Sequence, residues 1–175
     1  NHFSTQGSAG GPQGMINISF IDEVTLSTSA FGVEYDNPLS GVLQFNQKNG
    51  NPKELSGNFR FGASDSAITI EGPLSKEENN KTTFIFSARK SYLQFLFKLI
   101  GLPIRPDYWD FQGKINHKID DYNSLNIIGL GAIDDFSVEA PDDFDFTQQS
   151  FLEQVPIIEQ NSTTIGASWV RKFKE

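Results

Sequence analysis

The sequence predicts an all-β protein whose main element is an antiparallel sheet of about six strands. Aromatic and turn-forming residues are abundant, because the 175 residues include 16 Phe, 4 Tyr, 2 Trp and 15 Gly. Such a composition favours strands and tight turns over helices. Apolar and polar residues also alternate with a period of two along six segments, and short polar connections between these segments alternate with long ones.

The alternation is clearest in 109–119, where Trp109, Phe111 and Ile115 share one face while Asp110 and Lys114 share the other. The six expected strands are 54–63, 67–74, 81–92, 109–119, 124–134 and 163–173. Two further strands are expected before them, at 20–28 and 41–48. The connections at 75–80 and 120–123 are short, whereas those at 93–108 and about 135–161 are long.

This pattern fits two architectures, a soluble antiparallel sandwich and a transmembrane barrel, because both alternate apolar and polar side chains. Short turns at one end and long loops at the other are typical of the barrel. Aromatic residues near strand ends also fit the interfacial girdles of a barrel. These aromatic residues are Tyr92, Trp109, Tyr122, Trp169 and Phe173.

The charge is acidic and uneven. A formal net charge of −8 argues against a nucleic-acid partner. Residues 119–170 contain ten acidic side chains and no Lys or Arg. Within them, Asp142, Asp143 and Asp145 are either a solvated loop or a loop site for a cation, although the segment lacks the Gly and the distal Glu of a calcium loop.

No motif indicates catalysis, a cofactor or a resident metal. The chain has no Cys, and its two histidines, His2 and His117, are far apart with no spaced acidic partner. Gly129 and Gly131 imitate a dinucleotide-binding motif, but no helix pattern follows them. We therefore expect a protein that is not an enzyme and that holds no cofactor.

The most apolar stretch, 92–102, includes Gln94 and Lys98 and is too short for a membrane helix. If helical, it would be apolar nearly all round and would have to pack against loops, a partner chain or lipid.

Several stretches taken together resemble the TonB-dependent outer-membrane receptors of Bacteroidota type. "VTLSTSAFGVEYDNPLSGVLQFNQKNGN" is similar to the end of the plug domain of these receptors, and "EGPL" (71–74) and "SARKSYL" (87–93) resemble their first barrel strands. "INHKIDDYNSLNIIGLGAIDDF" resembles the next short turn and barrel strand. One departure is Asp36–Asn37, which stands where the family usually has Gly after the turn Tyr. Asn tolerates the left-handed conformation, so the turn can survive.

The resemblance implies a transmembrane antiparallel β-barrel, represented here in part by about six strands, with the C-terminal part of an N-terminal plug domain. Residues 1–51 would be the end of the plug and residues 52–175 the first barrel strands. The family builds a 22-stranded barrel, so the chain resembles a fragment. The segment that contacts TonB would lie upstream.

In such a barrel the apolar face meets lipid and the polar face meets the plug and the lumen. The candidate residues for ligand binding or for plug–barrel contacts are His2, Phe3, Gln6, Arg60, Arg89 and Asp110. Arg89 and Asp110 are candidates for ion pairs between the barrel and the plug. Structural contact with the plug is the plainer role, and ligand binding is the alternative.

The function implied by the resemblance is import of a scarce ligand across the Gram-negative outer membrane, with long loops extracellular and short turns periplasmic. The ligand would be a siderophore, vitamin, peptide or glycan. The expected partners are the TonB complex, the extracellular ligand and the lipid bilayer, with a surface lipoprotein or a larger envelope complex as further candidates. The alternatives are a non-transporting barrel subunit of an envelope complex and a soluble β-sandwich binding module.

Overall fold

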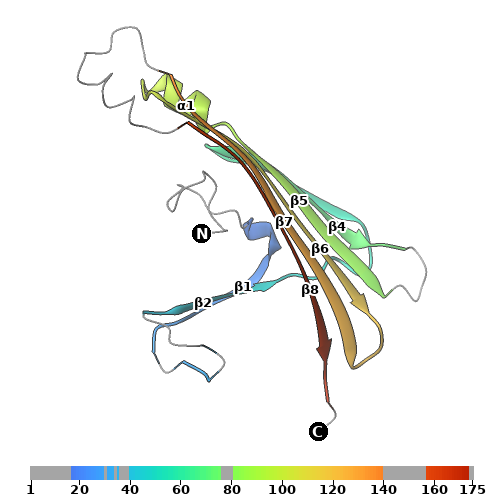
Figure 1. Cartoon of the computed structure of the whole chain (residues 1–175). Helices are drawn as coiled ribbons and strands as arrows, with labels where there is room; N and C mark the ends of the chain where they lie inside the picture. The colour runs from blue at the N-terminus through green and yellow to red at the C-terminus, as the bar shows by residue number, and fades with distance from the viewer. Residues whose placement is uncertain are drawn as a thin grey trace.

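The computed structural model describes residues 17–29, 31–33, 35, 40–75, 81–139 and 157–173, and for Ile158 the backbone only. In these residues the chain is all-β and antiparallel, as predicted, with a two-stranded and a six-stranded sheet (Figure 1). A short 3-10 helix, η1 (Ile18–Phe20), leads into the two-stranded sheet of β1 (Ile21–Ser27) and β2 (Val42–Gln47).

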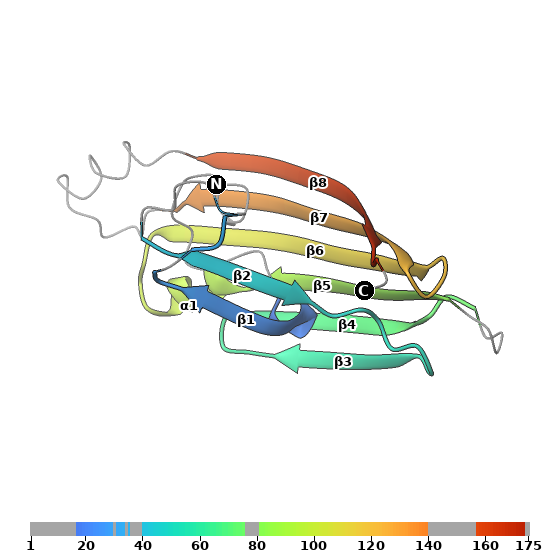
Figure 2. The ribbon, with the colours of Figure 1, turned by 90° about the horizontal axis from the view of Figure 1, so that it is seen from below.

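The six-stranded sheet is a meander in which each strand pairs with the next one along the chain. Its strands are β3 (Ser56–Phe61), β4 (Asp65–Pro73), β5 (Thr82–Ser91), β6 (Ile104–Lys118), β7 (Asn123–Val138) and β8 (Ile158–Arg171). Figure 2 shows them side by side in this order. Within the described residues, β3 and β8 are the edge strands. All six predicted strands are therefore confirmed.

Three strands extend beyond the ranges that alternation predicts. The observed β6 starts at Ile104, β7 ends at Val138 and β8 starts at Ile158. These extensions pair with one another, since Pro106 lies opposite Phe136 and Asp135 opposite Glu159. Sequence reasoning places them in loops because they carry a proline and several charges, which normally argue against a central strand.

The two faces of the six-stranded sheet differ in polarity, and the polar face is the buried one. We call the face that carries Asp110, Gln112, Lys114 and Asn116 the inner face, and the face that carries Trp109, Phe111, Gly113 and Ile115 the outer face. Gln112 is only 1% exposed, whereas Ile115 is 39% exposed. The same relation holds on β4, where Thr69 is buried while Ile68 and Ile70 are exposed. This burial is the reverse of that in a soluble protein.

The N-terminal elements lie on the inner-face side of the sheet, which η1 and the end of β2 approach, while the rest of β1 and β2 projects away from it (Figures 1 and 2). The Asn17 side chain donates a 2.6 Å hydrogen bond to Ser87 Oγ on β5. The ammonium group of Lys114 on β6 donates a 3.1 Å hydrogen bond to the carbonyl of Gln47 at the end of β2. The aromatic side chain of Phe20 in η1 is 1% exposed. These contacts give polar groups of the sheet hydrogen-bond partners in the N-terminal elements.

The β1–β2 hairpin presents its own apolar face outward. Val24 lies opposite Phe45 and Leu26 lies opposite Leu43, so these four side chains share one face, and all four are exposed. A two-stranded sheet is marginally stable alone. The hairpin therefore depends on its contacts with the rest of the protein.

The ends of the six-stranded sheet also differ. At one end, α1 (Leu93–Leu99) follows β5 and packs beside β6, with Leu93 buried and Phe95 exposed. The predicted apolar segment is thus helical. In the described part of the chain, no helix has the length and hydropathy needed to cross a membrane.

At the opposite end lies the tight β6–β7 turn. The Asp120 carboxylate accepts hydrogen bonds from the Asn123 side chain and from the backbone N–H groups of Tyr122 and Asn123. These bonds, the one from the Asn123 side chain first, lower the pKa of Asp120 below its ordinary value. These hydrogen bonds therefore stabilise the turn more when the Asp120 carboxylate is ionised than when it is protonated.

Gly50 allows the segment after β2 to touch the backbone of β5. A Cβ atom at residue 50 would lie 2.6 Å from the carbonyl carbon of Phe84 and closer still to its oxygen. Backbone atoms cannot yield as the tip of a side chain can, so only glycine fits at this contact.

We expect Gly50→Ala to separate this segment from β5 and to lower the free energy of unfolding by about 1–3 kcal/mol, the usual range for overpacking. The urea midpoint measures the change. Gly129→Ala is the matched control, because a Cβ there has no neighbour within 4 Å. Equal midpoints for the two variants would contradict the packing argument.

Candidate functional site

The most concentrated chemistry in the described residues is a cluster of charged side chains on the inner face. Arg60 of β3, Asp65 of β4, Arg89 of β5 and Asp110 of β6 come from four successive strands. Register brings them together, because Arg60 lies opposite Ala67, Ala67 opposite Arg89, and Arg89 opposite Asp110. Directly paired residues point to the same face of a sheet. We call these four residues the inner charge cluster.

Arg89 is the centre of the inner charge cluster. Its Nε donates to Asp110 Oδ2 at 2.6 Å, and its Nη1 lies 3.8 Å from Asp65 Oδ2. Arg60 Nη2 lies 3.3 Å from the other oxygen of Asp65. The Arg89 guanidinium also lies over the ring of Tyr108, 5.7 Å from the ring centroid. Each carboxylate thus has at least one guanidinium partner.

The cluster is deeply buried. Asp110 is 1% exposed, Arg89 is 5% exposed and Asp65 is 7% exposed. Charges removed from water to this degree are stable only when they are paired and hydrogen-bonded. Arg60 is the exception, since a third of its side chain is in contact with solvent. Arg60 is therefore the cluster member most accessible to another molecule.

A second polar network continues from the cluster along the inner face. Ser87 Oγ accepts hydrogen bonds from both the Asn17 amide and the Thr69 hydroxyl, the latter at 3.2 Å. Nearby, the Asn116 amide donates a 2.8 Å hydrogen bond to Asn126 on β7. These neutral groups connect β4–β7 with the N-terminal elements. The inner face is therefore a polar contact surface rather than an apolar core.

The charged groups of the inner charge cluster are paired with one another. The inner charge cluster contains no nucleophile with an adjacent base, and its guanidinium and carboxylate groups are engaged with one another. No group of three or more His, Cys, Asp or Glu side chains is placed to hold a metal ion in the residues described. The inner face can instead hold another protein segment or a polar ligand through hydrogen bonds.

The structure brings together three of the residues singled out from the sequence, Arg60, Arg89 and Asp110. Arg89 and Asp110 pair with each other across the β5–β6 ladder. Their contact with a plug or a ligand stays a prediction. The other candidates lie outside the described residues. These are His2, Phe3, Gln6, Asp142, Asp143 and Asp145.

Sequence reasoning missed Asp65, which joins the two arginines. Asp65 is the first residue of β4, but it lies between the expected strands 54–63 and 67–74. It also missed Tyr108 and Asp134, which lie opposite each other on the inner face and are both buried. Extending the parity of Asp110 back by two residues would have placed Tyr108 on the inner face.

Comparisons of the chain with protein-family models, with curated proteins and with solved structures found no match.

We expect Asp110→Ala to lower the free energy of unfolding by about 3–5 kcal/mol, because it leaves the buried Arg89 charge without its closest partner. Glu139→Ala is the matched control, since it removes an exposed carboxylate paired with Arg105 and should cost about 0–1 kcal/mol. Urea titration of both variants gives the comparison.

The double variant Arg89→Met/Asp110→Leu should be more stable than Asp110→Ala alone, because it removes both charges together. If Asp110→Ala lowered the free energy of unfolding no more than Glu139→Ala does, the fold would not depend on the buried Arg89–Asp110 ion pair.

Proposed function

We propose that the chain is part of a TonB-dependent outer-membrane receptor that imports a scarce ligand. In this proposal, residues 52–175 are the first strands of a transmembrane antiparallel β-barrel and residues 1–51 are the C-terminal part of its plug domain. The long connections are extracellular and the short turns are periplasmic. The ligand is a siderophore, vitamin, peptide or glycan.

The observation that carries the proposal is the reversed polarity of the six-stranded sheet. Ile68, Phe86 and Ile127 are exposed on the outer face, whereas Thr69, Ser87 and Gln112 are buried on the inner face. In water, exposing so many apolar side chains on one face is unfavourable. Against hydrocarbon the same arrangement is favourable, since lipid solvates the outer face and protein covers the inner face.

The dimensions of the outer face agree with a bilayer. On β6, outward side chains run from Trp109 to His117, a stretch of about 9 residues, and a tilted strand that spans a bilayer needs about 9–11. The apolar band of an outer-membrane barrel is about 25 Å tall and is flanked by aromatic residues. Trp109 at one end is contacted by Lys90, and Trp169 lies at the other end, in register with His117 through Leu125.

The contacts of the N-terminal elements support the plug assignment. Asn17 and Gln47 both bond to the inner face, which is the face that a plug would touch. The inner charge cluster lies on that same face, and its Arg60 is accessible to a plug or to a ligand passing through the lumen. Energised transport itself rests on the resemblance of the sequence to the receptor family.

A non-transporting barrel subunit of a larger envelope complex is the second candidate. It is favoured by the exposed apolar side chains of the α1 region, Phe95, Leu99 and Ile100, which suit a protein partner. The soluble β-sandwich is disfavoured, because a sandwich buries apolar side chains between its sheets, whereas the sheet contacts Asn17 and Gln47 here through the polar side chains of Ser87 and Lys114.

Neighbouring positions on β8 test the membrane assignment. Ile165 is 75% exposed on the outer face, and Thr164 is exposed on the inner face. We expect Ile165→Lys to destabilise the inserted protein by about 2–4 kcal/mol and to lower its amount in outer-membrane fractions, whereas Thr164→Lys should be tolerated. In a soluble protein both lysines would be solvated, so equal amounts of the two variants would overturn the proposal.

Transport is tested separately in the full-length receptor. Deletion of its TonB-contacting segment should abolish growth that depends on import, scored on a panel of siderophores, vitamins, peptides and glycans. Binding of the growth-supporting compound to the purified variant should be unchanged. Import that persisted after the deletion would exclude TonB-driven transport and favour the second candidate.

A further inference from the structure

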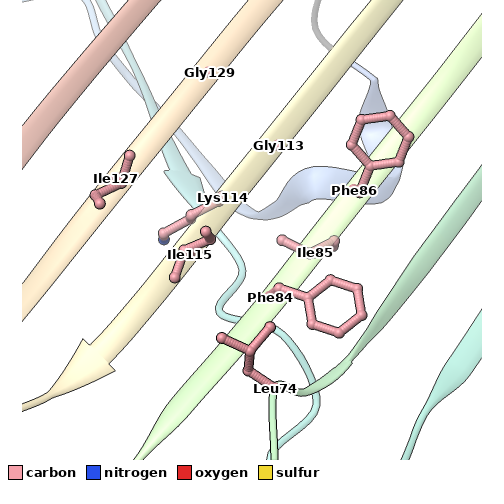
Figure 3. Close-up of a pocket in the computed structure, with 9 residues that line it drawn as sticks. All are labelled: Leu74, Phe84, Ile85, Phe86, Gly113, Lys114, Ile115, Ile127 and Gly129. Atoms are coloured by element: carbon pink, nitrogen blue, oxygen red, sulfur yellow. The ribbon is translucent and has the colours of Figure 1, made fainter.

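The outer face contains a hollow of about 380 Å³ at the centre of the sheet (Figure 3). The residues that line it belong to β5, β6, β7 and the end of the segment that follows β4, so neither β3 nor β8 contributes to it. Its shape is therefore independent of any strand that pairs with the edges of the sheet. Its walls are apolar side chains of the outer face, namely Leu74, Phe84, Phe86, Ile115 and Ile127.

Two directly paired glycines also line the hollow. Gly113 lies opposite Gly129 in the β6–β7 ladder. A Cβ atom at Gly129 would have no neighbour within 4 Å, and a Cβ atom at Gly113 would meet only the ring of Phe86, at 3.7 Å. Backbone packing therefore does not require glycine at either position, and a larger side chain at either one would fill the hollow. We call this hollow the glycine notch.

A polar pair lies on the same face, next to the glycine notch. Thr82 and His117 are directly opposite each other on β5 and β6. Thr82 is two residues from Phe84, and His117 is two residues from Ile115, so the pair shares the outer face with these two walls of the notch. The Thr82 hydroxyl and His117 Nδ1 are 2.7 Å apart. The register thus places a hydrogen-bonded pair at the short-turn end of the notch.

The hydrogen bond to Thr82 determines what the other ring nitrogen of His117 can do. When the Thr82 hydroxyl donates to Nδ1, the proton of the neutral ring lies on Nε2. Nε2 is then a hydrogen-bond donor on the outer face. In the membrane assignment this face meets lipid, and the ester carbonyls of glycerolipids are acceptors located at the boundary of the hydrocarbon.

The positions of the notch and the pair along β6 fit one lipid molecule. Gly113 is halfway between Trp109 and His117, which end the row of outward side chains on this strand. The notch therefore lies in the middle of the apolar band and His117 at its short-turn end. Trp169 is in register with His117 through Leu125, and tryptophan is typical of the membrane interface. An acyl chain whose carbonyl meets His117 would extend toward the middle of the band, where the notch lies.

We propose that the chain retains one glycerolipid of the leaflet on the short-turn side. One acyl chain lies in the glycine notch, and the ester carbonyl of that chain accepts a hydrogen bond from His117 Nε2. The proposal rests on the membrane assignment above. A flat sheet contacts an acyl chain on one side only, whereas the notch has walls from β5 and from β7. The walls and the carbonyl contact distinguish the retained lipid from the lipid that surrounds any membrane protein.

The first experiment measures lipid binding to the purified full-length protein in detergent by native mass spectrometry, with dioleoylphosphatidylglycerol as probe. One molecule per chain should bind saturably. Gly129→Leu should weaken binding at least tenfold, because the leucine side chain fills the notch. Gly131→Leu, on the same strand and face but outside the hollow, is the matched control and should stay within twofold of the unmodified protein.

The carbonyl contact has its own variant and its own probe. His117→Phe keeps an aromatic ring at this position but removes the donor, so it should weaken binding of the ester lipid at least fivefold. It should leave unchanged the binding of dioleyl-ether phosphatidylglycerol, which has the same headgroup and no ester carbonyl. Trp169→Phe, in the same row but outside the notch, is the matched control and should stay within twofold for both lipids.

The heat-induced mobility shift of each variant on gels reports whether it is folded, so loss of fold is distinguished from loss of lipid. Equal binding by folded Gly129→Leu and Gly131→Leu would overturn the proposal, as would unsaturable uptake of many lipids. Equal weakening of ester and ether lipid by His117→Phe would overturn the carbonyl contact.

Release of a co-purified protein by Gly129→Leu, with no lipid held by the unmodified protein, would overturn the proposal in favour of a transmembrane partner. The membrane assignment is judged independently by Ile165→Lys and Thr164→Lys, so failure of one proposal is not failure of the other.

Discussion

The buried ion pair between Arg89 and Asp110 is the constraint on which the arrangement of the sheet depends. The two residues lie directly opposite each other on β5 and β6, and their side chains meet at 2.6 Å. A slip of one residue between these strands would move Arg89 to the outer face and separate it from Asp65 as well. Because a buried charge without a partner is strongly unfavourable, the correct register is distinguished from its neighbours by several kcal/mol.

The register of β5 and β6 in turn determines which of their side chains are neighbours on both faces of the sheet. It aligns Ser87 with Gln112 on the inner face, where Asn17 bonds to Ser87. On the outer face it aligns Phe86 with Gly113. A polar network on one side of the sheet therefore determines the shape of an apolar surface on the other. The contacts of the two faces are consequences of the same strand pairing.

Much of the sheet could be predicted from sequence, because apolar and polar residues alternate wherever each face of a strand lies in a single environment along its length. The segment 109–119 was assigned correctly to its two faces for this reason. Alternation fails where the environment changes along a strand, as in the start of β6 with Pro106 and Asp107. There the strand continues because its backbone pairs with β7. The local sequence gives no sign of this pairing.

The candidate site was harder to predict than the sheet. Arg89 and Asp110 could be placed on the inner face by parity, but their partnership depends on the register between β5 and β6. Asp65 was missed because Asp is typical of tight turns. Its local sequence therefore does not indicate that it is the first residue of a strand. The docking of Asn17 on Ser87 joins positions 70 residues apart, and nothing near either residue indicates the contact.

The two edges of the six-stranded sheet are unequal, since β3 has 6 residues and β8 has 14. Along β8, every second residue directs its backbone amide and carbonyl groups away from β7, so the longer edge is a template for adding another strand. The shorter edge offers far less backbone for such pairing. Addition of a further strand by backbone pairing is therefore favoured at the β8 edge over the β3 edge.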